Sequence, residues 1–182
     1  APLSLPSFDN SAMDGYAVTL TEAELQQYQL PIGKTVTAGD AISPHTPNTA
    51  CRIFTGAPIP LGADTVIPQE NVEIIEKNGE RFALFPNTLK KGSHIRRQGE
   101  DFLQGTPALP AESLLYAPHI GLLAALGIGN ISVYDTLKVA ILSTGNELAT
   151  IGTTLQSGQI YNSNRYMLSA LLKKQGCELV RV

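Results

Sequence analysis

The sequence predicts a multidomain protein that mixes β and α/β structure, and three observations support this fold class. Through residues 1–102, glycine and proline separate short apolar runs, as is typical of a β-rich domain. Residues 103–136 carry leucine and alanine at helical spacing, so we expect a helical connecting segment that is part of an elongated domain. Residues 137–182 contain a strand, an amphipathic helix and a second strand, which predict the N-terminal βαβ part of a parallel α/β domain.

The β-rich segment carries one clear hairpin signal and one short helix. Asn78 and Gly79 join two alternating apolar runs, and this dipeptide favours a type I′ turn between antiparallel strands. Residues 20–28 predict a helix in which Thr21 is the N-cap and Glu24, three positions later, completes a capping box. Further strands are expected in the runs KTVTAG, CRIFTG and DTVIPQ, which are residues 34–39, 51–56 and 64–69.

Two more helices are predicted beyond the β-rich segment. The first lies within residues 108–130, with Pro110 near its start and Gly127 as its C-terminal stop. The second begins after a long loop and is capped by Asn162 or Ser163.

The second helix is flanked by two predicted strands. Residues 139–145 form a continuous apolar run, as expected of a strand buried on both faces, and residues 177–182 form the other strand. Open parallel sheets bind ligands beyond the carboxyl ends of their strands, so the loop at residues 143–148 is a candidate site. Since a βαβ unit of this size cannot bury both faces of its strands, we expect the chain to be a fragment truncated within this domain.

Composition and charge exclude several function classes. The chain has 182 residues, 43% of them hydrophobic and 16% charged, and its net charge of −3 argues against nucleic-acid or membrane-surface binding. No apolar run approaches the roughly 20 residues that a membrane span needs. Cys51 and Cys177 lack the spacing of a zinc site or a disulfide framework, so we expect reduced thiols and a cytoplasmic location. The GxGxxG and P-loop signatures of nucleotide sites do not occur.

Residues 8–18, FDNSAMDGYAV, concentrate turn-forming residues directly before an apolar run. One interpretation is a loop whose Asp and Asn side chains cap their own backbone. The other is a site in which Asp14 and its neighbours face a metal ion or a phosphate. Hydroxyl and carboxylate groups recur at other strand ends, where each serves either as a turn cap or as a site residue: Thr55, Asp101, Ser143, Thr144 and Glu147.

A basic cluster stands out in this acidic chain. Lys90, Lys91, Arg96 and Arg97 lie within eight residues of each other. Such a run is usually a solvated face, but adjacent guanidinium groups also suit oxyanions and phosphates. Both interpretations stay open from the sequence.

Five sequence blocks resemble the molybdopterin molybdenumtransferases, the MoeA and gephyrin E-domain family. They are FDNSAMDGYAV, RIFTGAPIPLGADTVIPQE, IRRQGEDFLQG, VAILSTGNEL and GQIYNSNRYML, and they occur in the family's order over nearly the whole chain. The resemblance implies that residues 137–182 begin a MogA-like molybdopterin-binding domain. Because further family segments on both sides are not in this sequence, we expect an internal fragment and assign any activity to its full-length parent.

The resemblance implies an enzyme of molybdenum cofactor biosynthesis. Family members take adenylylated molybdopterin and molybdate, release AMP and leave molybdenum on the dithiolene sulfurs, with Mg²⁺ or a similar divalent ion required. A homodimer is implied, with a small-molecule pterin substrate and contact with a molybdopterin adenylyltransferase, but no nucleic acid or membrane partner. The alternative is a non-catalytic scaffold of the gephyrin type.

The resemblance also implies roles for particular residues. Positions that match Asp14, Thr55 and Asp101 line a cleft in the family, and Glu147 matches a functional glutamate of the pterin-binding domain. Asn146 stands where many relatives carry Asp, so we assign it no role. The catalytic set is Asp14, Thr55, Asp101 and Glu147, the substrate-binding set is Arg96, Arg97, Ser143 and Thr144, and the metal ligands are Glu147 and Asp14.

Overall fold

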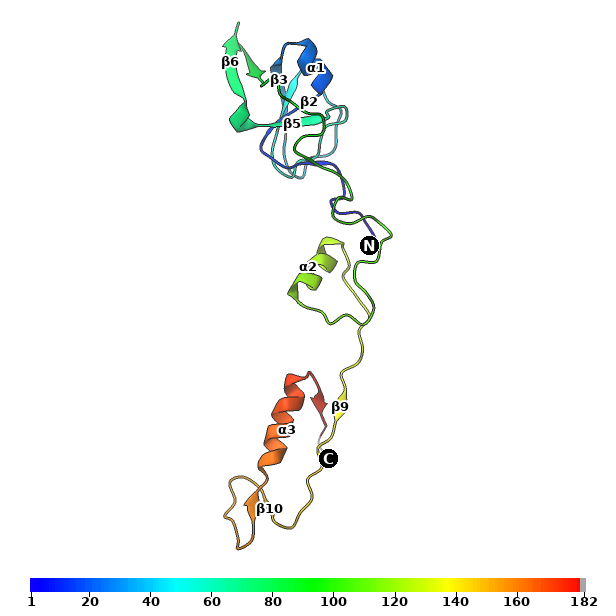
Figure 1. Ribbon diagram of the computed structural model, residues 1–182, viewed down its shortest axis with the longest axis vertical. Coiled ribbons are helices and arrows are strands. Elements are labelled where there is room, and N and C mark those ends of the chain that lie inside the picture. Colours follow the sequence, from blue (N-terminus) through cyan, green and yellow to red (C-terminus); the bar gives the residue numbers. More distant parts are fainter. Residues whose placement is uncertain (181–182) are drawn as a thin grey trace. The chain divides into compact units, whose positions relative to one another are not determined.

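A computed structural model describes residues 1–180 and divides the chain into two compact units (Figure 1). The first unit is Ala1–Gly129 and the second is Asn130–Val182. The first is built around a β-sheet, and the second holds a parallel strand pair joined through a helix, so the predicted mixture of β and α/β structure is confirmed. The predicted three-part division, with boundaries after residues 102 and 136, stays a prediction.

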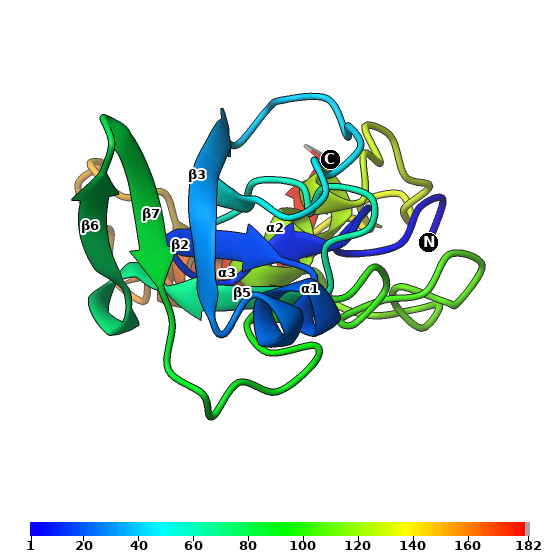
Figure 2. The same ribbon diagram turned by 90° about the horizontal axis from the view of Figure 1, so that it is seen from above.

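The first unit contains a six-stranded sheet in the order β5-β2-β4-β3-β7-β6. All neighbouring strands are antiparallel except β3 and β4, which are parallel. Viewed from above, β6, β7 and β3 lie side by side (Figure 2). The strands are β2 (Gly15–Val18), β3 (Gln29–Val36), β4 (Ala50–Ile53), β5 (Thr65–Pro68), β6 (Glu73–Lys77) and β7 (Glu80–Leu84).

The sheet buries apolar side chains on both of its faces. Along β2, Tyr16 and Val18 belong to one buried cluster and Ala17 to another, because successive side chains of a strand point to opposite faces. Leu30 and Ile67 fill the first cluster, together with Phe85. Strands predicted from alternation and turn signals are therefore confirmed at β4 and β5, which bury nearly all of their residues.

The hairpin signal is confirmed, whereas the predicted cap of the first helix is wrong. Asn78 and Gly79, with φ of 54° and 83°, form the turn between β6 and β7. Helix α1 (Leu20–Leu25) begins after Thr19 rather than Thr21, and the Thr19 side chain makes no capping bond. The Leu20 amide instead donates to Asp64 Oδ1 at 2.9 Å, so a residue 44 positions away caps this helix.

Helix α2 (Ala117–Ala125) is shorter than the predicted helix and starts later. Pro118, not Pro110, occupies its first turn, where a missing amide proton costs nothing. Gly127 follows the helix with φ of 71°, which confirms it as the C-terminal stop.

The second unit contains the predicted βαβ arrangement, but its first strand is shorter than expected. Strand β9 (Lys138–Val139) pairs in parallel with β12 (Glu178–Leu179), and α3 (Ser163–Lys174) lies between them in the chain. Asn162 is the N-cap, because its side chain accepts from the Arg165 amide. Residues 140–145 are not part of β9, so the strand expected over 139–145 is wrong in length. Residues 181 and 182 of the predicted last strand lie outside the described residues.

The predicted long loop of the second unit contains a further strand pair. Strand β10 (Leu148–Ala149) pairs in parallel with β11 (Ile160–Tyr161). The backbone of Glu147 joins this pair, since its carbonyl accepts from the Ile160 amide at 2.7 Å. Within residues 1–180, no helix has both the length and the apolar character to cross a membrane.

Candidate functional site

Three segments far apart in the sequence meet at β1 (Asn10–Ser11) in the first unit. Strand β1 pairs with β8 (Ile95–Arg96), which brings Asn10 opposite Arg96. The Ser11 amide donates to the Ala57 carbonyl at 2.9 Å, and its own carbonyl accepts from the Gly56 amide at 2.8 Å. Residues 9–14, 54–57 and 94–101 therefore form one polar region, which we call the β1 region.

Asp14 is held by Thr55 within the β1 region. Its Oδ1 accepts from both the amide and the hydroxyl of Thr55, each at 2.8 Å. These two bonds, together with the charge of Arg52, lower the pKa of Asp14 and keep it ionised at neutral pH. Within residues 1–180, Oδ2 has no hydrogen-bond partner, so one carboxylate oxygen is available to a ligand.

Side chains of the polar loop at residues 8–18 serve partly as turn caps, as one interpretation expects, and partly as links to distant segments; the alternative of a metal or phosphate site stays a prediction. Ser11 Oγ and Asn10 Nδ2 bind backbone two residues away, as turn caps do. The carboxylates of Asp9 and Asp14 instead bind Gln98 and Thr55 in distant segments. The carboxylates thus join the segments of the β1 region together.

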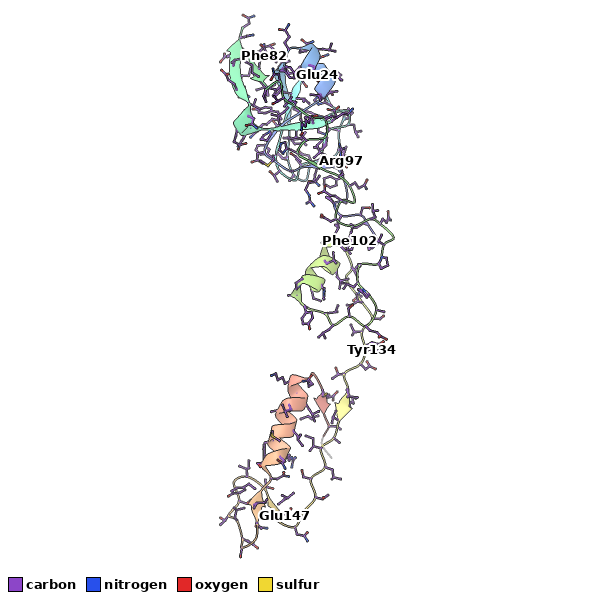
Figure 3. The ribbon with its side chains drawn as sticks, in the orientation of Figure 1. Glu24, Phe82, Arg97, Phe102, Tyr134 and Glu147 are labelled. Carbon is purple, nitrogen blue, oxygen red and sulfur yellow. The ribbon has the colours of Figure 1, made fainter. Side chains whose placement is uncertain are left out.

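The predicted arginines lie in ion pairs with carboxylates of the same region. Arg96 Nη2 is 2.6 Å from Asp101 Oδ2, and Arg97 Nη1 is 2.6 Å from Asp9 Oδ2 (Figure 3 labels Arg97). Asp101 raises the pKa of Arg96 through this contact. Of the predicted set, the structure pairs Asp14 with Thr55 and Asp101 with Arg96, and in the described part of the chain no direct bond joins the two pairs. All four side chains are at least partly exposed, so solvent and ligands reach them.

The second unit holds Glu147 in the loop before β10 (Figure 3). Its carboxylate folds back on Gly145, where an added Cβ would lie 2.5 Å from either oxygen. Gly145 also has φ of 149°, a backbone conformation that other residues rarely adopt. Glycine is therefore required at this position for the observed placement of the Glu147 side chain.

A pocket of about 530 Å³ lies between this loop and α3. Ser143 lines it, while Thr144 and Glu147 are not among its lining residues, and the substrate-binding role of Ser143 stays a prediction. Helix α3, which was not predicted to contribute to a site, adds two cations and a hydroxyl at intervals of four residues, a spacing that places them on one helix face. These pocket residues are Arg165, Ser169 and Lys173.

Metal binding at either site would depend on few protein ligands. Among residues 1–180, no group of three or more His, Cys, Asp or Glu side chains is arranged to hold a metal ion. Asp14 Oδ2 and the exposed carboxylate of Glu147 are hard oxygen donors of the kind Mg²⁺ prefers, and Mg²⁺ usually takes only one or two protein carboxylates. The residues therefore fit Mg²⁺ only if phosphate and water complete its coordination.

Comparison with known proteins accounts for nearly the whole chain. Residues 1–127 match the family model described as the MoeA N-terminal region (domain I and II), and residues 140–182 match one described as a probable molybdopterin binding domain. The molybdopterin molybdenumtransferase of Haemophilus influenzae is 44% identical over 99% of this chain, which spans 44% of that protein. Molybdopterin molybdenumtransferase 2 of Mycobacterium tuberculosis is 42% identical, also over 99% of the chain and 45% of its own length.

Solved structures agree with these sequence matches. The crystal structure of the molybdopterin biosynthesis MoeA protein from Pyrococcus horikoshii matches with a TM-score of 0.82 at 31% identity, covering 99% of this chain and 48% of that one. The chain thus spans less than half the length of the relatives it matches. Because the family model covers more than half of the chain, and relatives align from end to end of it, the chain belongs to the MoeA family of molybdopterin molybdenumtransferases.

Proposed function

We propose that the full-length parent of this chain inserts molybdenum from molybdate into adenylylated molybdopterin and releases AMP. The observation that carries the proposal is the 44% identity to a molybdopterin molybdenumtransferase over 99% of the chain. The exposed, ionised Asp14 beside Thr55 supports it, because this pair is a ready site for a cation or a hydrogen-bonding ligand. Curated relatives carry the enzyme's name, which disfavours the scaffold alternative.

We propose the predicted residue roles on chemical grounds. Two anionic substrates repel each other, so positive charge is needed to bring them together. Arg96 and Arg97 can exchange their exposed carboxylate partners for phosphate or molybdate oxygens, since exposed ion pairs are worth little. Asp101 holds Arg96 in the free protein and is released when Arg96 binds an oxyanion, while Ser143 and Thr144 offer hydroxyls at the pterin-binding unit.

Mg²⁺, when bound, would neutralise charge on the pyrophosphate linkage whose cleavage releases AMP. We propose Asp14 and Glu147 as its protein ligands, and these carboxylates also serve, with Thr55 and Asp101, as the proposed catalytic set. Thr55 orients Asp14 by occupying Oδ1 twice, which leaves Oδ2 for the ion or for the substrate.

The proposed partners and location follow from the family. We propose a homodimer in the cytoplasm that exchanges substrate with a molybdopterin adenylyltransferase. Mixing Asp14→Asn and Glu147→Gln variants of the full-length parent tests the dimer, if each substrate site takes these two residues from different subunits. Random pairing gives half heterodimers with one intact site each, so roughly a quarter of wild-type activity should return. Recovery at background level, with subunit exchange verified by mass spectrometry, would contradict the shared site.

The direct test is AMP release by the full-length parent from adenylylated molybdopterin and molybdate. Asp14→Asn and Glu147→Gln should each lower the rate about a hundredfold or more, because a charge facing the reacting groups is lost while shape is kept. Glu80→Gln, an exposed carboxylate on β7, is the matched control and should retain wild-type activity. A parent that binds the substrate but never releases AMP would refute the proposed reaction.

A further inference from the structure

Arg52 on β4 has an unusually complete set of contacts for a partly exposed side chain. Its guanidinium lies 5.2 Å from the ring centre of Tyr16 and 4.8 Å from that of Phe54. Its Nη1 donates to the Gly15 carbonyl at 3.1 Å, and its Nη2 donates to Gln69 Oε1 at 2.5 Å. Two rings and two acceptors therefore fix the plane of the guanidinium.

Three of these four contacts involve a residue that is adjacent to Asp14 or Thr55 in the chain or hydrogen-bonded to Asp14. Gly15 follows Asp14 directly, and Phe54 precedes Thr55. The Gln69 amide donates to the Asp14 carbonyl at 3.0 Å, so the residue that accepts from Arg52 also holds the backbone of Asp14. Arg52 thus contacts all three segments from which the Asp14 environment is built.

The contacts leave the reactive part of the carboxylate unused. Arg52 binds backbone and amide oxygens, while Thr55 occupies Asp14 Oδ1. Among residues 1–180, Asp14 Oδ2 has no hydrogen-bond partner, so the arrangement leaves this oxygen for a ligand.

We propose that Arg52 is a positioning residue that locks the Asp14 loop against the Thr55 segment and so sets the direction of Asp14 Oδ2. This inference rests on the proposed function, because it assumes that Asp14 acts on substrate or metal. Lysine cannot replace Arg52 in this role, since a point charge neither donates in a planar fork nor stacks on two rings at once.

The test compares Arg52→Lys with Arg81→Lys in the full-length parent. Arg81 lies exposed on β7 of the same sheet and serves as the matched control. We expect Arg52→Lys to lower kcat for AMP release about tenfold to a hundredfold with a much smaller change in KM, as displacement of a reacting group by about 1 Å does. Arg81→Lys should change neither constant.

A second readout separates positioning from mere support of the fold. In the 182-residue chain, hydrogen exchange of the Thr55 amide, followed by NMR, reports on its bond to Asp14 Oδ1. Arg52→Lys should speed this exchange, because the Thr55 segment is no longer locked against the Asp14 loop, whereas Arg81→Lys should leave it unchanged. A variant that loses thermal stability but keeps both kcat and the wild-type exchange of the Thr55 amide would show that Arg52 only supports the fold, and would overturn the inference.

Two further variants keep the test decisive. If Arg52→Lys does not fold, Phe54→Leu removes one stacking ring and keeps both hydrogen bonds of Arg52; it should lower kcat by a smaller factor, and wild-type kcat would overturn the inference. Asp14→Asn distinguishes the two proposals. If Asp14→Asn is inactive while Arg52→Lys is fully active, only the proposed role of Arg52 is wrong. If Asp14→Asn is active, the proposed role of Asp14 in the reaction is wrong.

Discussion

Replacing Gly15 with alanine should disrupt the sheet beside the β1 region. An added Cβ would lie 2.0 Å from the Ile67 carbonyl oxygen, 2.8 Å from its carbonyl carbon and 3.1 Å from Pro68 Cα. Since carbon and oxygen normally approach to about 3.3 Å, β5 would have to move by more than about 1 Å. All three obstructing atoms belong to the buried backbone of β5, so no side chain can rotate away. We therefore expect a loss of about 3 kcal/mol, at the upper end of overpacking costs.

Thermal unfolding of the 182-residue chain, followed by circular dichroism, measures this loss. For a unit of this size, about 3 kcal/mol corresponds to a decrease of roughly 10 °C in Tm. Gly121→Ala is the control within the same unit: its Cβ meets nothing within 4 Å inside α2, so it should stabilise by about 0.5–1 kcal/mol. A Gly15→Ala protein that melts within about 2 °C of wild type would refute the reasoning from close approach.

Three further predictions concern other parts of the chain. Burial lowers the pKa of His45 below 6.5, so at lower pH the unfolded chain binds more protons than the folded chain. The free energy of unfolding should therefore be highest above pH 6.5 and should decrease as the pH falls below that value. Urea unfolding at several pH values should show this decrease, and His45→Leu should make the free energy less dependent on pH. Asn162→Ala should lower the stability of α3 by about 1 kcal/mol, because the Arg165 amide loses its acceptor. Hydrogen exchange of the α3 amides measures this loss, and unchanged protection of these amides would contradict the capping role of Asn162. Burial raises the pKa of the fully buried Cys51 thiol, so the native protein should react with a thiol reagent at Cys177 alone. Unfolding in urea should make Cys51 react as well. Rapid reaction of both thiols in the native protein would contradict this prediction.

Local chemistry made some of the fold predictable. The Asn78-Gly79 turn needs two residues with positive φ, a requirement that this dipeptide meets without help from the rest of the protein. The strands β4 and β5 follow from apolar runs between turn residues, and Gly127 ends α2 because it tolerates the left-handed conformation.

Long-range contacts decided what the sequence did not predict. The start of α1 was misplaced because Asp64, which is 44 positions away, supplies the cap that a local pattern assigned to Thr21. The pairing of Asp14 with Thr55 spans 41 positions, so the residues were identified individually but their contact was not. Arg52 gave no signal, because a single arginine in an alternating strand does not indicate which rings and carbonyls will surround it.

The pairing of Asp9 with Arg97 joins residues 88 positions apart, and this separation has a consequence for the order of folding. Closing a chain loop of that length costs entropy before any contact is gained, so long-range pairings form late unless local structure shortens the loop. The six-stranded sheet lies within that loop and shortens it once formed. The β1 region should accordingly become ordered after the sheet, once Gln98 has left the ribosome, and nascent chains that end before this residue would carry a complete sheet without the polar region that Asp9 closes.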